Sequence, residues 1–348
     1  MSNSILTKKQ YPAVDIMKFV MALLVIILHR KVFPAEMEFA NFITGQVICR
    51  ITVPFFFIVS SFLLFKKIDP TQPQSKSFFF ATEKRLILLY ILWSVIYLPC
   101  NFVKSFTGHY NEITIGGLIG QVFVWIKDFI FEQSFLHLWY MNSLIFALLV
   151  VYLLLKKLSP KTVTIIFLIT SVIALLVDQL LQINDYLPGP VYKLFVSSGF
   201  CISLGAYIAK NDLSVLLKKK WLLTTISFAI LIAAGVIRFI SKNENFYVLT
   251  EFMAYITAFC IVIVCLDSDK ENKKYHKTLR NYSTLLYFSH FLIMENTFSY
   301  LAAKTGNPAF TQSNTLIFIL TIIVAFTFSF IVINLSKVKG FRWLKNIY

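Results

Sequence analysis

DIMKFVMALLVIILH, residues 15–29, is an apolar run that contains three ionisable side chains, Asp15, Lys18 and His29. Ionisable groups are costly in hydrocarbon, and they usually face a protein interior or a water-filled cavity. On a helix, the residues from Lys18 to His29 make about three turns, so the two side chains share one face, ~16 Å apart along the axis. The stretch therefore predicts a membrane helix that forms one wall of a polar path.

The rest of the chain has the same apolar character. Of its 348 residues, 57% are hydrophobic and only 14% are charged, and the mean hydropathy is +0.72. Apolar runs of about 18 or more residues recur along the whole sequence, as expected for membrane-spanning helices. We expect residues 1–348 to form a single integral domain, an all-α polytopic membrane helix bundle. It has about ten transmembrane helices, near residues 13–33, 45–65, 86–106, 136–155, 162–182, 191–209, 221–240, 247–266, 282–303 and 314–335.

The net charge of +16 is distributed as in a membrane protein. If the N-terminus is cytoplasmic, 23 of the 33 basic residues fall in inner segments and nine on the outer side. This asymmetry follows the positive-inside rule and predicts that both termini are cytoplasmic. We find no phosphate-binding loop or nucleic-acid-binding module, so we expect a multi-pass protein of the cell membrane whose partner is the lipid bilayer and not nucleic acid.

The sequence also lacks the spacing of a metal site. Its cysteines lie in or beside apolar runs, without the pairs typical of zinc ligands or of a disulfide framework. We expect them to be small buried hydrophobic residues, and we expect neither a metal nor a bound cofactor. The five are Cys49, Cys100, Cys201, Cys260 and Cys265.

The predicted topology assigns a depth to each polar residue within the spans. Those toward the inner side are Asp15, Lys18, Lys84 and Arg85. Those toward the outer side are His29, Arg50 and His137, and His290 lies near mid-depth. A bundle that gathers each set would contain an inner cationic site and an outer histidine site.

Each of these residues also has a structural interpretation. Lys18 can snorkel to the inner headgroups while it pairs with Asp15, three residues earlier. The other structural roles are those of interfacial histidines (His29, His137), a hydrogen-bonded bundle histidine (His290), interfacial or positive-inside arginines (Arg50, Arg85) and an aromatic belt (Trp139, Tyr140).

The longest outer connection, residues 107–135, contains an apolar stretch interrupted by Gln121, Lys127 and Asp128. Two interpretations are open. The segment is either an amphipathic helix that lies along the membrane interface or a re-entrant lid.

Several short motifs follow one another along the chain. The first span has an acidic residue, a basic residue and, after ten more, a histidine: Asp15, Lys18 and His29. RITVPFFF follows at 50–57, KRL at 84–86 with YILW at 90–93, HLWYM at 137–141, LGAY at 204–207 and STLLYFSH at 283–290. In this order the motifs resemble those of the acyltransferase-3 family, integral membrane acyltransferases that include O-acetyltransferases of bacterial surface glycans.

The resemblance covers nearly the whole predicted core and has three departures. Lys18 stands where many members have arginine, and Ser61 stands where glycine is usual. Ile87 stands where some members have a second arginine.

This resemblance implies an enzyme that takes an acyl group from cytoplasmic acyl-CoA, typically acetyl-CoA, and transfers it to a hydroxyl of a cell-surface glycan or a lipid-linked precursor. Imidazole has an unperturbed pKa of about 6.5 and exchanges protons near neutral pH. The pattern therefore implies that His29 performs acid–base catalysis or carries a transient acyl group. The resemblance also implies that Asp15 and Lys18 take part in catalysis. Lys84 and Arg85 would bind the phosphates of acyl-CoA. The residues implied to bind the acceptor substrate are Arg50, His137, Trp139 and His290.

Two other classes of function fit the same outline. A transporter or flippase for a glycan precursor also has many helices and a polar internal path. A sensor or partner subunit would use the motif residues for structure alone. The nature of the acyl group and of the acceptor (polysaccharide, teichoic-acid-like polymer, peptidoglycan or lipid-linked sugar) stays open.

Overall fold

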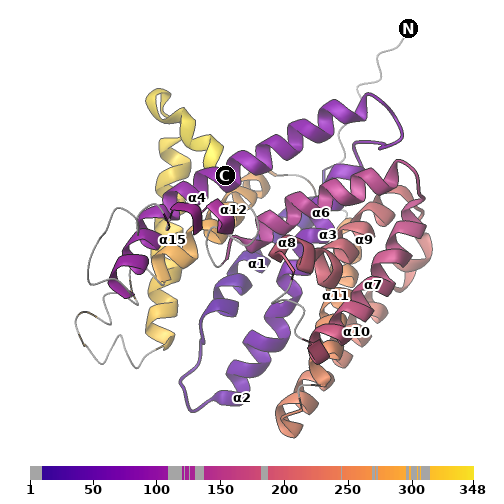
Figure 1. Ribbon diagram of the computed structural model, residues 1–348, viewed down its shortest axis with the longest axis horizontal. Coiled ribbons are helices and arrows are strands. Elements are labelled where there is room, and N and C mark those ends of the chain that lie inside the picture. The colour runs from indigo at the N-terminus through magenta and orange to yellow at the C-terminus, as the bar shows by residue number, and fades with distance from the viewer. Residues whose placement is uncertain are drawn as a thin grey trace.

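The computed structural model describes residues 10–108, 137–181, 187–243, 245–268, 273–294 and 314–348, with short stretches at 120, 122–124, 126–129, 271, 298, 304 and 306. These residues form helices and no β-strand (Figure 1). The longer helices are α1 (Pro12–His29), α3 (Thr52–Phe65), α4 (Ser75–Gly108), α6 (Trp139–Leu155), α7 (Pro160–Leu181), α9 (Gly199–Lys210), α10 (Ser214–Ser241), α11 (Phe246–Leu266), α12 (Lys274–Ile293) and α15 (Asn314–Leu335). The shorter segments are α2 (Glu38–Asn41), η1 (Phe42–Val47), η2 (Ile48–Ile51), α8 (Gly189–Lys193), η4 (Leu194–Ser198) and η6 (Lys339–Ile347).

Seven stretches of helix in the described part of the chain are long and apolar enough to cross a bilayer, so the chain is a multi-pass membrane protein. They are Pro12–His29, Glu38–Phe65, Pro160–Leu181, Gly189–Lys210, Ser214–Ser241, Phe246–Leu266 and Thr315–Leu335. This confirms the all-α membrane bundle, whereas the total of ten spans and the side of each terminus stay predictions. The segment at 107–135, for which a lid or an interfacial helix was expected, lies mostly outside the described residues.

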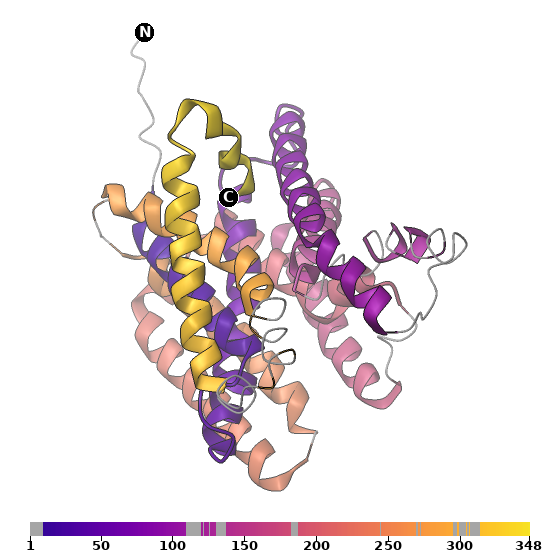
Figure 2. The same ribbon diagram turned by 90° about the vertical axis from the view of Figure 1, so that its left-hand side faces the viewer.

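Two predicted spans begin earlier than hydropathy indicated. Helix α4 begins at Ser75, and α12 begins at Lys274. Both helices start with polar turns, which continue the helix beyond its apolar part. Figure 2 shows α15 and α12 next to α1. Helix α4 also packs against α12, where the rings of Trp93 and Phe288 stack at 5.1 Å.

Side-chain contacts define one end of the bundle, which we call the inner end because it holds the residues predicted to be cytoplasmic. The guanidinium of Arg280 on α12 lies 3.5 Å from the carboxylate of Asp15 on α1. One turn further, the Ser283 hydroxyl donates a hydrogen bond to the carbonyl of Lys18. The ammonium of Lys210, at the end of α9, donates to the carbonyl of Ile68 just after α3.

At the opposite end, which we call the outer end, the chain turns back between spans. The hydroxyl of Thr315 at the start of α15 donates to the carbonyl of Val32, just after α1. Gln179 near the end of α7 donates to Asn245, which precedes α11. Successive spans therefore run in opposite directions.

Helix α3 lies in the middle of the bundle, against α1, α9 and α11. Its contact with α9 is close because Gly205 has no side chain: a Cβ there would lie 2.4 Å from the carbonyl oxygen of Ile58 and 2.6 Å from the Cβ of Ser61. The Ser61 hydroxyl donates a hydrogen bond to the carbonyl of Ile202 across the same contact. Serine at position 61, where the resemblance leads one to expect glycine, thus ties α3 to α9.

We expect Gly205→Val to destabilise the protein by about 1–3 kcal/mol, since the added atoms must push α9 away from α3. The matched control is Gly340→Val, because a Cβ at Gly340 would meet no atom within 4 Å. Thermal unfolding of the purified protein in detergent measures the difference. Equal midpoints for the two variants would contradict the close α3–α9 contact.

Two spans change helical type near the outer end. In the span Glu38–Phe65, η1 is a π-helix and η2 a 3-10 helix. In the span Gly189–Lys210, η4 is a π-helix. Single π-turns within α-helices are often found at functional sites, because they redirect the side chains that follow. These segments carry or adjoin the polar residues of the outer end.

Candidate functional site

Three histidines from distant parts of the sequence meet in the outer half of the bundle. The ring centres of His29, at the end of α1, and His290, on α12, are 5.3 Å apart. The ring of His137, which precedes α6, is 5.4 Å from that of His290. The next residue, Phe291, contacts the two other histidines: its ring stacks on that of His137 at 5.3 Å and meets that of His29 edge-on at 5.4 Å. The structure therefore brings His29 and His137, which were expected toward the outer side, together with His290, which was expected near mid-depth.

The backbone of α12 holds His290 in one tautomer. Its Nδ1 lies 2.7 Å from the carbonyl oxygen of Tyr287 and 3.1 Å from that of Leu286. Carbonyl oxygens only accept hydrogen bonds, so this assignment puts the ring proton on Nδ1. The lone pair is then on Nε2, which is buried and has no hydrogen-bond partner among the described residues. A buried acceptor of this kind is prepared to receive a proton or a hydrogen bond.

Two tyrosines fix the surroundings of the cluster. The Tyr287 hydroxyl donates a 2.6 Å hydrogen bond to the carbonyl of His137. The Tyr97 hydroxyl, from α4, donates to the carbonyl of Phe288 at 2.7 Å and accepts from the amide of Leu292 at 2.9 Å. These bonds join α4 and the segment before α6 to α12, so the histidines sit on a rigid frame.

A cavity of about 430 Å³ opens at the outer end beside His29. Its walls come from the end of α1 and the residues after it, from α2 and η1, and from Phe239 on α10. Ligand pockets of small molecules start at about 300 Å³. The polar side chains that line it belong to His29, Arg30, Lys31, Glu38, Asn41, Thr44 and Gln46.

Arg50 lies behind this cavity and is held by an acid and an amide. One guanidinium nitrogen is 2.9 Å from the carboxylate of Glu251 on α11. A second nitrogen donates to Oε1 of Gln46 at 2.8 Å. Gln46 lines the cavity, where its amide nitrogen can donate to a ligand. Arg50 is therefore connected to the cavity through Gln46.

Trp139, the first residue of α6, lies near the charged residues of the outer end. The ammonium of Lys193, at the end of α8, is 4.9 Å from the centre of its ring and 4.8 Å from that of Tyr192. Tyr192 in turn donates a 2.7 Å hydrogen bond to Asp178 on α7. A cation over an aromatic face is attracted by the ring quadrupole, so Trp139 holds Lys193 in place.

The inner residues are more dispersed than the outer ones. Asp15 pairs with Arg280, and the backbone of Lys18 accepts the Ser283 hydroxyl, so both are tied to α12. Lys84 and Arg85 lie on α4 with exposed side chains. The structure thus links Asp15 and Lys18 to the start of α12. It leaves the side chains of Lys84 and Arg85 exposed on the surface of α4.

Sequence reasoning missed Glu251 and Gln46. Glu251 is an acid near the start of the apolar run at 246–266, and the cost of burying a carboxylate was a sufficient signal. Gln46 carried no such signal, because its role depends on the π-helical turn η1. Among the described residues, no group of three or more His, Cys, Asp or Glu side chains is arranged to hold a metal ion.

The described residues thus form a multi-pass helical bundle with a histidine cluster beside an outer cavity. Comparison with protein families gives the class directly: the model of an acyltransferase domain, acyltransferase-3, matches residues 11–334, essentially the whole chain. The chain belongs to the acyltransferase-3 family. The resemblance noted from its motifs is confirmed.

Two curated relatives, each named amino-acid racemase and each from Enterococcus faecalis, are similar to part of the chain. One is 27% identical over 175 residues, which are 50% of this chain and 23% of the relative. The other is 24% identical over 161 residues, 44% of this chain and 21% of the relative. The matched part of the chain thus corresponds to less than a quarter of the length of these relatives. The name amino-acid racemase is theirs and is not carried over to this chain. No solved structure matches the chain significantly.

Proposed function

We propose that this acyltransferase moves an acetyl or similar small acyl group from acyl-CoA at the inner side to a hydroxyl of a cell-surface glycan or its lipid-linked precursor. The observation that carries the proposal is the position of His29, which contacts His290 on one side and lines the outer cavity on the other. A hydroxyl bound in that cavity meets an imidazole directly.

In the proposed reaction, His29 acts as general base. It accepts the proton of the acceptor hydroxyl as the oxygen attacks the acyl carbonyl, and the C–S bond of the thioester then breaks to release CoA thiolate. His290 supports this step: imidazoles whose centres are 5.3 Å apart reach an N–H···N hydrogen bond of about 3 Å when their nitrogens face each other. The Nε2 lone pair of His290 would thus stabilise the imidazolium of His29.

The remaining candidates have supporting roles in this proposal. Arg50 positions the amide of Gln46 toward the acceptor, and Glu251 keeps Arg50 in place. His137 completes the wall around His290, and Trp139 positions Lys193. Asp15 and Lys18 fix the base of α1 against α12, and so set the register of His29 against His290.

The direct test is transfer of label from radiolabelled acetyl-CoA to cell-envelope material. Membranes that contain the protein should label an envelope fraction, and membranes without it should not. Succinyl-CoA is run in parallel to identify the acyl group. If glycan moves across vesicle membranes without any label appearing from either donor, the chemistry proposed here is wrong.

A graded block of the cavity tests where the acceptor binds. Gly45 lines the cavity, and a Cβ there would meet only the carbonyl oxygen of Ile27, at 4.0 Å. An added Cβ therefore meets open space, and larger side chains extend from it into the cavity that Gly45 lines. We expect the transfer rate to fall from Gly45 to Gly45→Ala to Gly45→Leu, by about tenfold or more for leucine, because the hydroxyl is displaced from His29.

The control for this series is the yield of monodisperse protein after purification, which should be the same for all three chains. A Gly45→Leu protein with full activity and a normal yield would move the acceptor site away from this cavity.

A further inference from the structure

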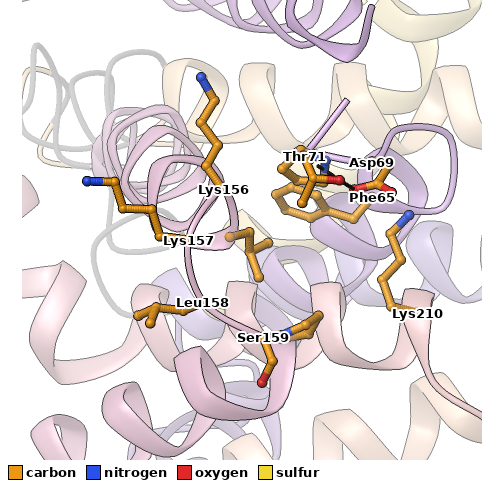
Figure 3. Close-up of a pocket in the computed structure, with 11 residues that line it drawn as sticks. Phe65, Asp69, Thr71, Lys156, Lys157, Leu158, Ser159 and Lys210 are labelled. Atoms are coloured by element: carbon orange, nitrogen blue, oxygen red, sulfur yellow. Dashed lines mark hydrogen bonds between the residues drawn. The ribbon is translucent and has the colours of Figure 1, made fainter. Parts of the chain in front are cut away.

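A second cavity, of about 380 Å³, lies at the inner end, well apart in the fold from the histidine cluster. It is enclosed by the residues that follow α3, by the turn between α6 and α7, and by the end of α9 (Figure 3). The motifs do not include any of the residues of that turn, and the proposed transfer step does not use them. The cavity therefore needs its own explanation.

Three of the residues that line this cavity are lysines. Figure 3 shows Lys156 and Lys157 on one side and Lys210 with Asp69 on the other. Lys210 is fixed at its end by a 2.7 Å hydrogen bond to the carbonyl of Ile68. Lys156 and Lys157 are exposed, and the ammonium of Lys156 lies 5.2 Å from the centre of the Tyr152 ring, so a change of rotamer is needed to bring it to a ligand in the cavity. The three ammonium groups outnumber the single carboxylate.

The carboxylate of Asp69 is already engaged. The amide and the hydroxyl of Thr71 both donate to its Oδ1, at 3.1 and 2.8 Å. These hydrogen bonds hold the pKa of Asp69 below its usual value, so the group stays ionised and stays in the turn. It thus balances part of the charge of Lys210 and leaves Lys156 and Lys157 uncompensated.

Helix α7 adds to the positive character of the cavity. It begins at Pro160, and both Pro160 and Ser159 line the cavity. The Ser159 side chain accepts the amide of Thr162, as an N-terminal cap does. The positive end of the helix dipole therefore lies at the same place as the lysines.

The inner wall of the cavity is apolar. Phe65 and Leu155 are buried, and Leu158 is half-buried beneath the lysines. A site with cations at its rim and hydrocarbon below suits a ligand that has a phosphate and an apolar or aromatic body. A small anion such as acetate or chloride would leave most of the 380 Å³ cavity unfilled.

We propose that this inner cavity binds a phosphate ester, with Lys156 and Lys157 as its mobile ligands and Lys210 as its fixed one. Two sources supply that chemistry at this end of a membrane protein. One is the phosphorylated nucleotide end of the acyl donor, an option that rests on the proposed function. The other is the headgroup of an anionic phospholipid of the inner leaflet, which basic pockets between helices bind.

The experiment measures binding without turnover, so it does not depend on whether transfer is detected. The variant is Lys156→Gln/Lys157→Gln, and its matched control is Lys218→Gln/Lys219→Gln, two exposed lysines on α10 that do not line the cavity. Full-length protein is placed in nanodiscs of phosphatidylcholine and titrated with radiolabelled CoA. In parallel, the protein is purified from phosphatidylglycerol-containing vesicles, and co-purified phosphatidylglycerol is counted.

Loss of two lysine contacts should weaken binding about tenfold in the first variant and leave the control unchanged. A selective loss of CoA binding assigns the cavity to the donor, and a selective loss of phosphatidylglycerol assigns it to the lipid. If neither ligand distinguishes the two variants, the cavity does not bind phosphate esters and the proposal is overturned. Size-exclusion profiles of the two variants should match, since all four lysines are exposed.

Discussion

The His29→Ala protein should insert into the membrane and purify normally, yet transfer acyl groups about 10²–10⁴-fold more slowly than the wild type. The expected range is that of general acid–base catalysis, since only the imidazole is lost. His29 is half-buried at the last position of α1, and its ring touches His290 and Phe291. Alanine favours helix and leaves the rest of α1 unchanged, so the effect should fall on the rate and not on the fold.

Two companion measurements separate chemistry from structure for His29. External imidazole should restore part of the rate of His29→Ala, because the cavity beside position 29 admits a small base. Leu28→Ala removes a side chain from the same wall without removing a base, and it should retain most of the activity. A His29→Ala protein that labels the envelope as well as the wild type would remove His29 from the mechanism.

The spans were predictable because the bilayer imposes their length. Residues 162–182 and 247–266 were predicted from hydropathy, and the helices run from Pro160 to Leu181 and from Phe246 to Leu266. The first eleven residues of α4 were not predicted, since its start at Ser75 lies in a polar segment that hydrocarbon does not select. Hydropathy therefore gives the membrane-embedded part of a helix and is silent about its extension.

The outer position of His29 and His137 followed from topology alone, because alternating spans fix which end each residue approaches, and His290 was expected near mid-depth. Their contact did not follow, since it depends on how α1 and α12 rotate about their axes. The sequence also could not predict that Nε2 of His290 carries the lone pair, because the tautomer depends on the hydrogen bonds of Nδ1 to two carbonyls of the same helix. The cavity beside Gly45 depends on the π-helical turn η1, for which the sequence holds no periodic signal.

Asparagine at position 290 should reduce transfer by about 10²-fold while preserving the fold. Its side-chain amide can still donate to the carbonyl of Tyr287, as Nδ1 of His290 does at 2.7 Å, but it has no group in the place of Nε2. Phenylalanine at this position fills the space but cannot donate a hydrogen bond to the carbonyl of Tyr287, so His290→Phe should lose stability as well as activity. Comparing the two variants separates the hydrogen bond that fixes the ring from the lone pair that serves the reaction.

The dependence of the rate on pH distinguishes a proton-accepting His290 from a merely structural one. If His29 and His290 must both be neutral, the logarithm of the wild-type rate should rise with a slope that approaches two on the acidic side of the profile. In His290→Asn only the proton of His29 remains to be lost, so the slope should fall to one. A variant that is slow but keeps the wild-type slope would show that His290 only shapes the site. Such a result would leave His29 to carry the proton alone, with the buried Nε2 as a feature of packing.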